Sequence, residues 1–243
     1  MDRIMKITLG LFLVILAVFV SIGSYSLIIN YAYKSSLSST YSYSCSIATD
    51  TPLTNVTLFL PLPVKTSGSS PVVERIGGYN VSGIPRDWET VIYGDEQATF
   101  LKITTGRIGE TSSTGSPENI TFIVKVKSPD LINTGSPLLH DAVFRPVQDS
   151  HGTECPAVPA NGTYTPSCSE YTTMLYARYD ASETGTVTIH ADLDAVNEWS
   201  IFHPDYNEYR NSFAAKLSGN VSGWMPASAW VESGIGSYDT PSR

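Results

Sequence analysis

The strongest constraint on this chain is an uninterrupted apolar run near its N-terminus. Residues Ile7 to Ile29 include no charged side chain and are dominated by Leu, Ile, Val and Phe. As an α-helix with a rise of ~1.5 Å per residue, the run is ~34 Å long, enough to cross a hydrocarbon core of ~30 Å. Lipid offers the backbone no hydrogen-bonding partners, so a run that crosses a bilayer must be helical throughout. We therefore expect a lipid bilayer partner through residues 7–29.

The charges that flank this run predict its direction. Arg3 and Lys6 precede it, and Lys34 follows it. Because basic residues tend to stay in the cytoplasm, residues 1–34 are expected to form a cytoplasmic N-terminus and transmembrane anchor. A signal peptide with a small-x-small cleavage pattern at Ser21-Ile22-Gly23 is the alternative, and it too would export the rest of the chain. The expected location is the cell membrane, single-pass, with the C-terminal domain outside.

Acceptor triplets for N-glycosylation support an external location. An Asn-x-Ser/Thr triplet is modified only in exported chains, where the glycan adds bulk and hydration to an exposed loop. The triplets begin at Asn55, Asn80, Asn119, Asn161 and Asn220. Occupied sites would make the protein a glycoprotein.

Cysteine spacing agrees with an oxidising compartment. Cys155 and Cys168 bracket a loop that contains Pro and Gly, so its ends can meet, and we expect this pair to form a disulfide. Pairings through Cys45 stay open. Cys45 lies in a run where apolar residues alternate with Ser, which predicts a strand with the thiol on its buried face. The alternative for Cys45 is an intermolecular disulfide.

The remaining sequence predicts a mainly β fold. Residues 35–232 contain many short apolar segments separated by Gly, Pro, Asn and Ser, which is typical of an antiparallel β-sandwich-like ectodomain. Within it, residues 128–168 are Pro-rich and are expected to form an irregular insertion. Residues 233–243 are expected to form a polar tail.

Individual elements follow from periodicity. Alternation predicts hairpins of 88–93 with 97–104 and of 170–179 with 186–194. One amphipathic helix is expected near the C-terminus, because Asp205 can cap it and Tyr209, Phe213 and Leu217 recur at every fourth position. Further strands are expected at 41–48, 55–62, 72–76, 119–127 and 229–232.

One stretch of the chain resembles a known group. The run from Asn55 to Val64, followed by Trp88, the strand 99–103 and Gly106-Arg107-Ile108, resembles uncharacterised membrane-anchored archaeal surface proteins. The resemblance covers mainly residues 40–130. It implies an archaeal envelope location and carries over no functional residue.

Candidate chemistry is sparse. His190, Asp192 and Asp194 alternate along a predicted strand, so their side chains would lie ~7 Å apart on one face and could bind a divalent cation. A flat row seldom converges on one ion, so a solvated sheet face is the competing interpretation. A nucleophile elbow, a phosphate-binding loop and a haem-attachment motif are all missing from the sequence, so we expect no cofactor and no catalytic residue.

These features favour a non-enzymatic, structural or adhesive cell-surface protein. Aromatic residues gather in the C-terminal quarter, where they could contact a carbohydrate or surface-protein partner or fill the core. The alternative is an extracellular hydrolase or ligand-binding module that uses the 128–168 insertion and nearby histidines. The net charge of −8 would repel phosphate backbones, so nucleic acid is not an expected partner. The histidines in question are His140, His151, His190 and His203, and the aromatic residues are Trp199, Tyr206, Tyr209, Trp224 and Trp230.

Overall fold

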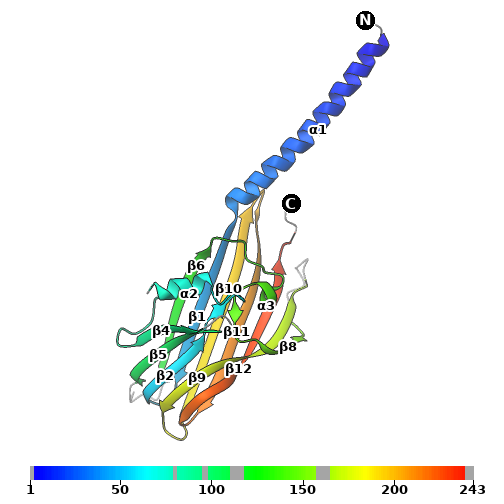
Figure 1. Cartoon of the computed structure of the whole chain (residues 1–243). Helices are drawn as coiled ribbons and strands as arrows, with labels where there is room; N and C mark the ends of the chain where they lie inside the picture. Colours follow the sequence, from blue (N-terminus) through cyan, green and yellow to red (C-terminus); the bar gives the residue numbers. More distant parts are fainter. Residues whose placement is uncertain (1–2, 79–80, 95–97, 110–117, 157–164, 239–243) are drawn as a thin grey trace.

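A computed structural model describes residues 3–78, 81–94, 98–109, 118–156 and 165–238. Helix α1 (Arg3–Ser36) projects as a single rod from one end of a long, curled antiparallel sheet (Figure 1). The helix is apolar over a length that could span a membrane, and none of its apolar stretch is buried by the rest of the chain. A helix that exposes Leu, Ile, Val and Phe on every side is suited to lipid rather than water.

The main sheet contains ten strands in the order β4-β5-β2-β9-β12-β11-β10-β1-β6, with β8 paired to β9 beside β2. The long strands are β1 (Ser38–Thr49), β2 (Leu53–Pro61), β5 (Thr99–Ile108), β6 (Glu118–Ser128), β9 (Ser167–Asp180), β10 (Thr186–Ser200), β11 (Pro204–Ser218) and β12 (Val221–Gly236). The shorter elements are β4 (Glu89–Gly94), β8 (Gln148–Thr153), the pair β3 (Pro63–Val64) and β7 (Val143–Phe144), and the helices α2 (Pro71–Gly77) and α3 (Pro137–His140). The expected mainly β, antiparallel fold is confirmed: ten strands form one curled main sheet, and β3 and β7 form a separate two-stranded sheet.

Strand β1 shows how the sequence selects the inner face. Tyr41, Tyr43, Cys45 and Ile47 are buried, whereas the Ser residues between them are only half-buried. Successive side chains of a strand point to opposite faces, so the alternation directs every second residue into the core. The prediction that Cys45 lies on the buried face is confirmed.

Large aromatic side chains fill the space enclosed by the sheet. Phe144 packs edge-on against Phe213, with ring centroids 4.9 Å apart, and lies 6.2 Å from the ring of Tyr43. All three side chains are almost completely buried. Burying an aromatic side chain of this size stabilises a fold by about 2–3 kcal/mol, so this inner layer supplies much of the driving force for folding.

The prediction of an amphipathic helix near the C-terminus is wrong. Residues 204–218 form strand β11, which pairs with β10 and β12. A spacing of four residues also satisfies the two-residue period of a strand, so Tyr209, Phe213 and Leu217 face the core in either structure. The deciding residues are Asn207 and Asn211 on the same buried face, where their amides are hydrogen-bonded.

The prediction that residues 170–179 pair with residues 186–194 in a hairpin is also wrong. Both strands exist as β9 and β10, and the inward set from Val187 to Leu193 is buried as expected. However, β9 pairs with β2, β8 and β12, whereas β10 pairs with β1 and β11. A two-residue period identifies a strand without identifying its neighbour, and the five-residue connection here crosses the end of the sheet.

The segment expected as a strand at 72–76 is helix α2. Ser70 caps it by accepting a hydrogen bond from the amide of Val73, and Pro71 occupies its first turn. Ser followed by Pro is a helix-start signal that outweighs the β propensity of the two Val residues.

The first part of the expected irregular insertion is held tightly against the inner face of the sheet. Asn197 receives a hydrogen bond from the amide of Ile132 and donates one to its carbonyl, at 3.1 and 2.9 Å. Asn211 receives one from the amide of Phe144 at 3.0 Å. Buried Asn side chains thus replace the backbone partners that an irregular segment lacks.

Candidate binding surfaces

The sheet has two distinct ends. At one end, which we call the anchor end because the expected membrane anchor α1 leaves the sheet there, α1 joins β1, and the β10–β11 turn lies beside that junction (Figure 1). At the far end lie the β1–β2, β9–β10 and β11–β12 turns. The position of each candidate site along this axis determines whether it could face the membrane or the space beyond it.

An aromatic cluster lies on the outer face of the sheet, in its far half. It brings together Phe59, Tyr93, Phe100, Tyr176 and Trp224, one from each of β2, β4, β5, β9 and β12. Neighbouring ring centroids lie 5.0 to 5.9 Å apart, in edge-to-face or tilted orientations. These are the geometries that aromatic pairs prefer.

The cluster is exposed at its rim. Tyr93 is 61% exposed and Trp224 is 49% exposed, whereas Phe100 beneath them is 7% exposed. The two exposed rings border an open cavity of about 440 Å³, which Gln148 and Met174 also line. A cavity with aromatic walls and a polar amide at its edge suits a small amphipathic ligand.

The sequence indicated only one member of this cluster. Of the aromatic residues noted in the C-terminal quarter, Trp224 and Tyr206 are exposed, whereas Trp199 and Tyr209 are buried. Trp230 is half-buried. The other four members come from four strands distributed over more than a hundred residues, so only the strand order could bring them together.

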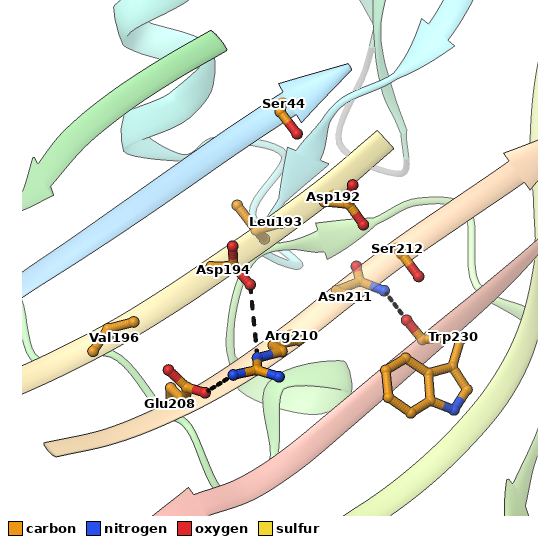
Figure 2. Close-up of a pocket in the computed structure, with 10 residues that line it drawn as sticks. All are labelled: Ser44, Asp192, Leu193, Asp194, Val196, Glu208, Arg210, Asn211, Ser212 and Trp230. Carbon is orange, nitrogen blue, oxygen red and sulfur yellow. Dashed lines mark hydrogen bonds and ion pairs between the residues drawn. The ribbon is translucent and has the colours of Figure 1, made fainter. Parts of the chain in front are cut away.

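A second cavity, of about 550 Å³, lies on the outer face over β1, β10, β11 and β12 (Figure 2). Figure 2 shows Arg210 between two carboxylates, with its Nη2 2.6 Å from Glu208 Oε1 and its Nε 3.9 Å from Asp194 Oδ1. Burial raises the pKa of Asp194, and the guanidinium of Arg210 partly offsets this rise. The cavity is a charged hollow, with Trp230 at its edge.

The three residues predicted to bind a cation do not all face one another. His190 and Asp192 meet, with Nε2 2.9 Å from Oδ2, but Asp194 lies beside Arg210. A guanidinium next to a carboxylate competes with a cation for it, so the row offers a metal ion two ligands rather than three. The metal site at His190, Asp192 and Asp194 stays a prediction.

The four histidines lie on different elements. His140 ends α3, His151 lies on β8, His190 on β10 and His203 in the β10–β11 turn. His151 Nε2 lies 3.7 Å from Glu170 Oε2, with both side chains mostly exposed. An exposed pair of this kind is typical of a solvated sheet edge.

The sulfur chemistry agrees with the sequence. Cys155 and Cys168 form a disulfide. Glu232 lies close to both sulfur atoms, but sulfurs joined in a disulfide are not thiolate ligands for a metal. A disulfide persists in an oxidising compartment. Cys45 is a free, buried cysteine, and burial raises the pKa of its thiol to about 12.

Three of the asparagines in acceptor triplets lie near the far end, and all three are exposed. Asn119 pairs with Ala48 near the end of β1, and Asn220 lies in the β11–β12 turn. Asn55 lies at the start of β2, where its amide Nδ2 donates to Asp180 Oδ2 at 2.7 Å. Asn80 and Asn161 lie outside the described residues.

Comparison with protein families, with curated proteins and with solved structures finds no match to this chain. The resemblance to archaeal surface proteins therefore stays a prediction.

Proposed function

We propose that this chain is a non-enzymatic, membrane-anchored surface protein of the adhesive class. Helix α1 holds it in the bilayer, and the sheet presents its outer face beyond the membrane. The aromatic cluster is the contact surface. The observation that carries this proposal is the exposure of Tyr93 and Trp224 on the far half of the sheet, away from the anchor.

A carbohydrate is the ligand that this surface suits best. Exposed aromatic rings offer flat apolar faces to the C–H groups of a sugar ring, and a nearby amide can bond its hydroxyls. The cavity beside Tyr93 and Trp224 has Gln148 at its edge and a volume of about 440 Å³, within the range of small-ligand sites. Lys102, whose Nζ lies 5.9 Å from the ring centroid of Phe59, adds a cation at the cluster and would favour acidic sugars.

The external location has independent support. The Cys155–Cys168 disulfide fits an oxidising compartment, and the exposed triplet asparagines lie on the same far end as the contact surface. Glycans there would hydrate the end that faces outward. A hydrolase has less support, because neither of the two cavities described above is lined by any of the four histidines.

A glycan array tests the proposal with a matched pair of variants. Trp224 and Trp230 both lie on β12, but only Trp224 belongs to the aromatic cluster. We expect the wild-type protein and Trp230→Ala to bind the same sugars, and Trp224→Ala to lose binding at least tenfold. If Trp230→Ala alone lost binding, the charged cavity would be the site. If the wild type bound no glycan above the level of Trp224→Ala, the carbohydrate assignment would be wrong.

A further inference from the structure

The anchor helix is joined to the sheet without a flexible linker. Only Leu37 separates α1 from β1, and its amide continues the helical hydrogen bonding to Tyr33 at 2.9 Å. Beside this junction, Ser36 Oγ accepts a hydrogen bond from the amide of Ser200 at 2.9 Å and lies 3.0 Å from its carbonyl oxygen. The β10–β11 turn is therefore fastened directly to the end of the anchor.

An aromatic contact strengthens the same joint. The ring of Tyr33 meets the ring of Trp199 at 67°, with centroids 5.7 Å apart. Trp199 is 4% exposed, so this contact is well packed. The position of the turn relative to the bilayer is thus set by the position of α1.

The tip of the turn is apolar and exposed. The turn reads Ser200-Ile-Phe-His-Pro204 and contains no carboxylate. Phe202 at its tip is 77% exposed. Strand β10 runs toward the anchor end, so the turn extends beyond Ser200 on the side from which α1 leaves the sheet (Figure 1).

The distances bring Phe202 within reach of a bilayer. From Asn30 to Ser36, α1 continues for ~10 Å beyond its apolar run. The headgroup layer on each side of the hydrocarbon core is ~5–8 Å thick. Two extended residues span up to ~7 Å, so a turn that starts at the level of Ser36 can place Phe202 in that layer.

The two ends of the sheet differ in the way that a membrane contact requires. Near the anchor end, Leu131, Tyr206 and Tyr238 are also exposed, at 49%, 40% and 45%. In the described part of the chain, the turns at the far end expose no large hydrophobic side chain. Aromatic side chains prefer the membrane interface, so a membrane contact accounts for their exposure near the anchor end and not in the far-end turns.

We propose that the β10–β11 turn is a second membrane contact, with Phe202 seated in the headgroup layer of the outer leaflet. The proposal rests on the anchor in the proposed function and adds a lipid-binding site in the β domain. One helix alone leaves the domain free to tilt. Together with α1, the turn gives the domain two contacts with the same leaflet and limits that tilt.

Site-directed spin labelling of the full chain in lipid nanodiscs tests this contact. Cys45 is buried and the other two cysteines form a disulfide, so the label reacts with an introduced cysteine. The variants are Phe202→Cys, Ser182→Cys in the far-end β9–β10 turn, and Val18→Cys inside α1. Each label is measured for collisions with oxygen, which concentrates in lipid, and with a water-soluble nickel complex.

The expected result is that the ratio of oxygen to nickel collisions is highest at 18, intermediate at 202 and lowest at 182, because the headgroup layer is partly hydrated. A high ratio at 18 together with a ratio at 202 as low as that at 182 would overturn the second contact and leave the anchor intact. Ratios at 18 and 202 that are both as low as that at 182 would overturn the anchor and the contact that rests on it. A second measurement places the label at Tyr206→Cys. There, Phe202→Asp should raise the collision rate with the nickel complex at least twofold, and an unchanged rate would also count against the contact.

Discussion

The hydroxyl of Tyr41 donates a hydrogen bond to Asp141 Oδ1, which joins the first strand of the sheet to a segment one hundred residues later. Asp141 is 1% exposed and also accepts hydrogen bonds from the amides of Asn133 and Ala142, each at 2.7 Å. Burial is the main cause that raises the pKa of Tyr41, and the hydrogen bond to Asp141 adds to it. One carboxylate therefore organises the segment that covers the inner face.

Replacement of this carboxylate should destabilise the whole domain. In Asp141→Ala, the Tyr41 hydroxyl and two amides lose a charged partner in a buried site, which should cost about 3–5 kcal/mol. Asp141→Asn keeps the shape and part of the bonding, so it should cost less. Urea unfolding measures the difference, with the exposed Glu183→Ala as a control expected within about 0.5 kcal/mol of wild type. Equal stability of Asp141→Ala and the control would contradict the assigned role.

Thiol labelling should distinguish the free Cys45 from the two cysteines of the disulfide. Under native, non-reducing conditions, we expect no maleimide labelling, because Cys45 is buried and the others are bonded. Unfolding without reductant should expose one thiol, and unfolding with reductant should expose three. Mass spectrometry of the labelled chain counts them. A dimer on a non-reducing gel would instead show that Cys45 pairs between chains.

The Cys45 thiol also predicts a loss of stability at high pH. Burial raises its pKa from 9.0 to about 12, so the folded state holds its proton where the unfolded state has lost it. The contribution of this thiol is complete below pH ~9 and is lost as the pH rises toward 12. Cys45→Ala should remove that part of the pH dependence. A wild-type stability curve that coincides in shape with that of the variant above pH 9 would rule this out.

Removal of the disulfide should weaken the fold without unfolding it. A loop of about this size contributes roughly 3 kcal/mol through the entropy of the unfolded chain. Cys155→Ser with Cys168→Ser should therefore shift the urea midpoint downward, whereas the aromatic cluster and α1, which lie elsewhere, should keep their contacts. Near-ultraviolet circular dichroism reports the aromatic packing. A double variant as stable as the wild type would show that the crosslink carries little of the stability.

Glycosylation should differ among the described acceptor sites. Asn119 and Asn220 are exposed, and the amide Nδ2 of Asn55 is held by Asp180 at 2.7 Å. In a host that glycosylates exported proteins, we expect Asn119→Gln and Asn220→Gln each to increase gel mobility by one step, and Asn55→Gln to change it least. Asp180→Ala frees the Asn55 amide and should increase its occupancy. Identical mobility of all these proteins would mean that none of these three sites carries a glycan.

The sequence predicted the faces of the strands better than their partners. Tyr41 to Ile47 and Val187 to Leu193 point inward as their alternation indicates, because face selection depends on local hydrophobicity. The partner of β9 depends on which distant edge offers the best packing, and alternation contains no information on that choice. The error at 205–217 has a related cause, because a four-residue spacing fits both a helix and a strand.

The candidate surfaces were still harder to predict. Four of the five rings in the aromatic cluster lie outside the C-terminal quarter, and Phe59 sits in a continuous apolar run that reads as core on both faces. Phe202 lies in a short turn whose sequence has no membrane-binding pattern, and the contacts of Ser36 with Ser200 and of Tyr33 with Trp199 place that turn beside α1. Such sites arise from the order of strands, which the local sequence does not encode.

The single-residue joint at Leu37 has a mechanical consequence. The twelve residues of β1 extend for ~40 Å, so under the proposed anchoring the far end of the sheet lies ~40 Å from the membrane surface and moves with α1 as one stiff unit. A sideways pull at Trp224 would reach α1 as a torque instead of being absorbed by a slack tether. Under the proposed adhesive function, the height of the contact surface above the membrane is therefore set by strand length.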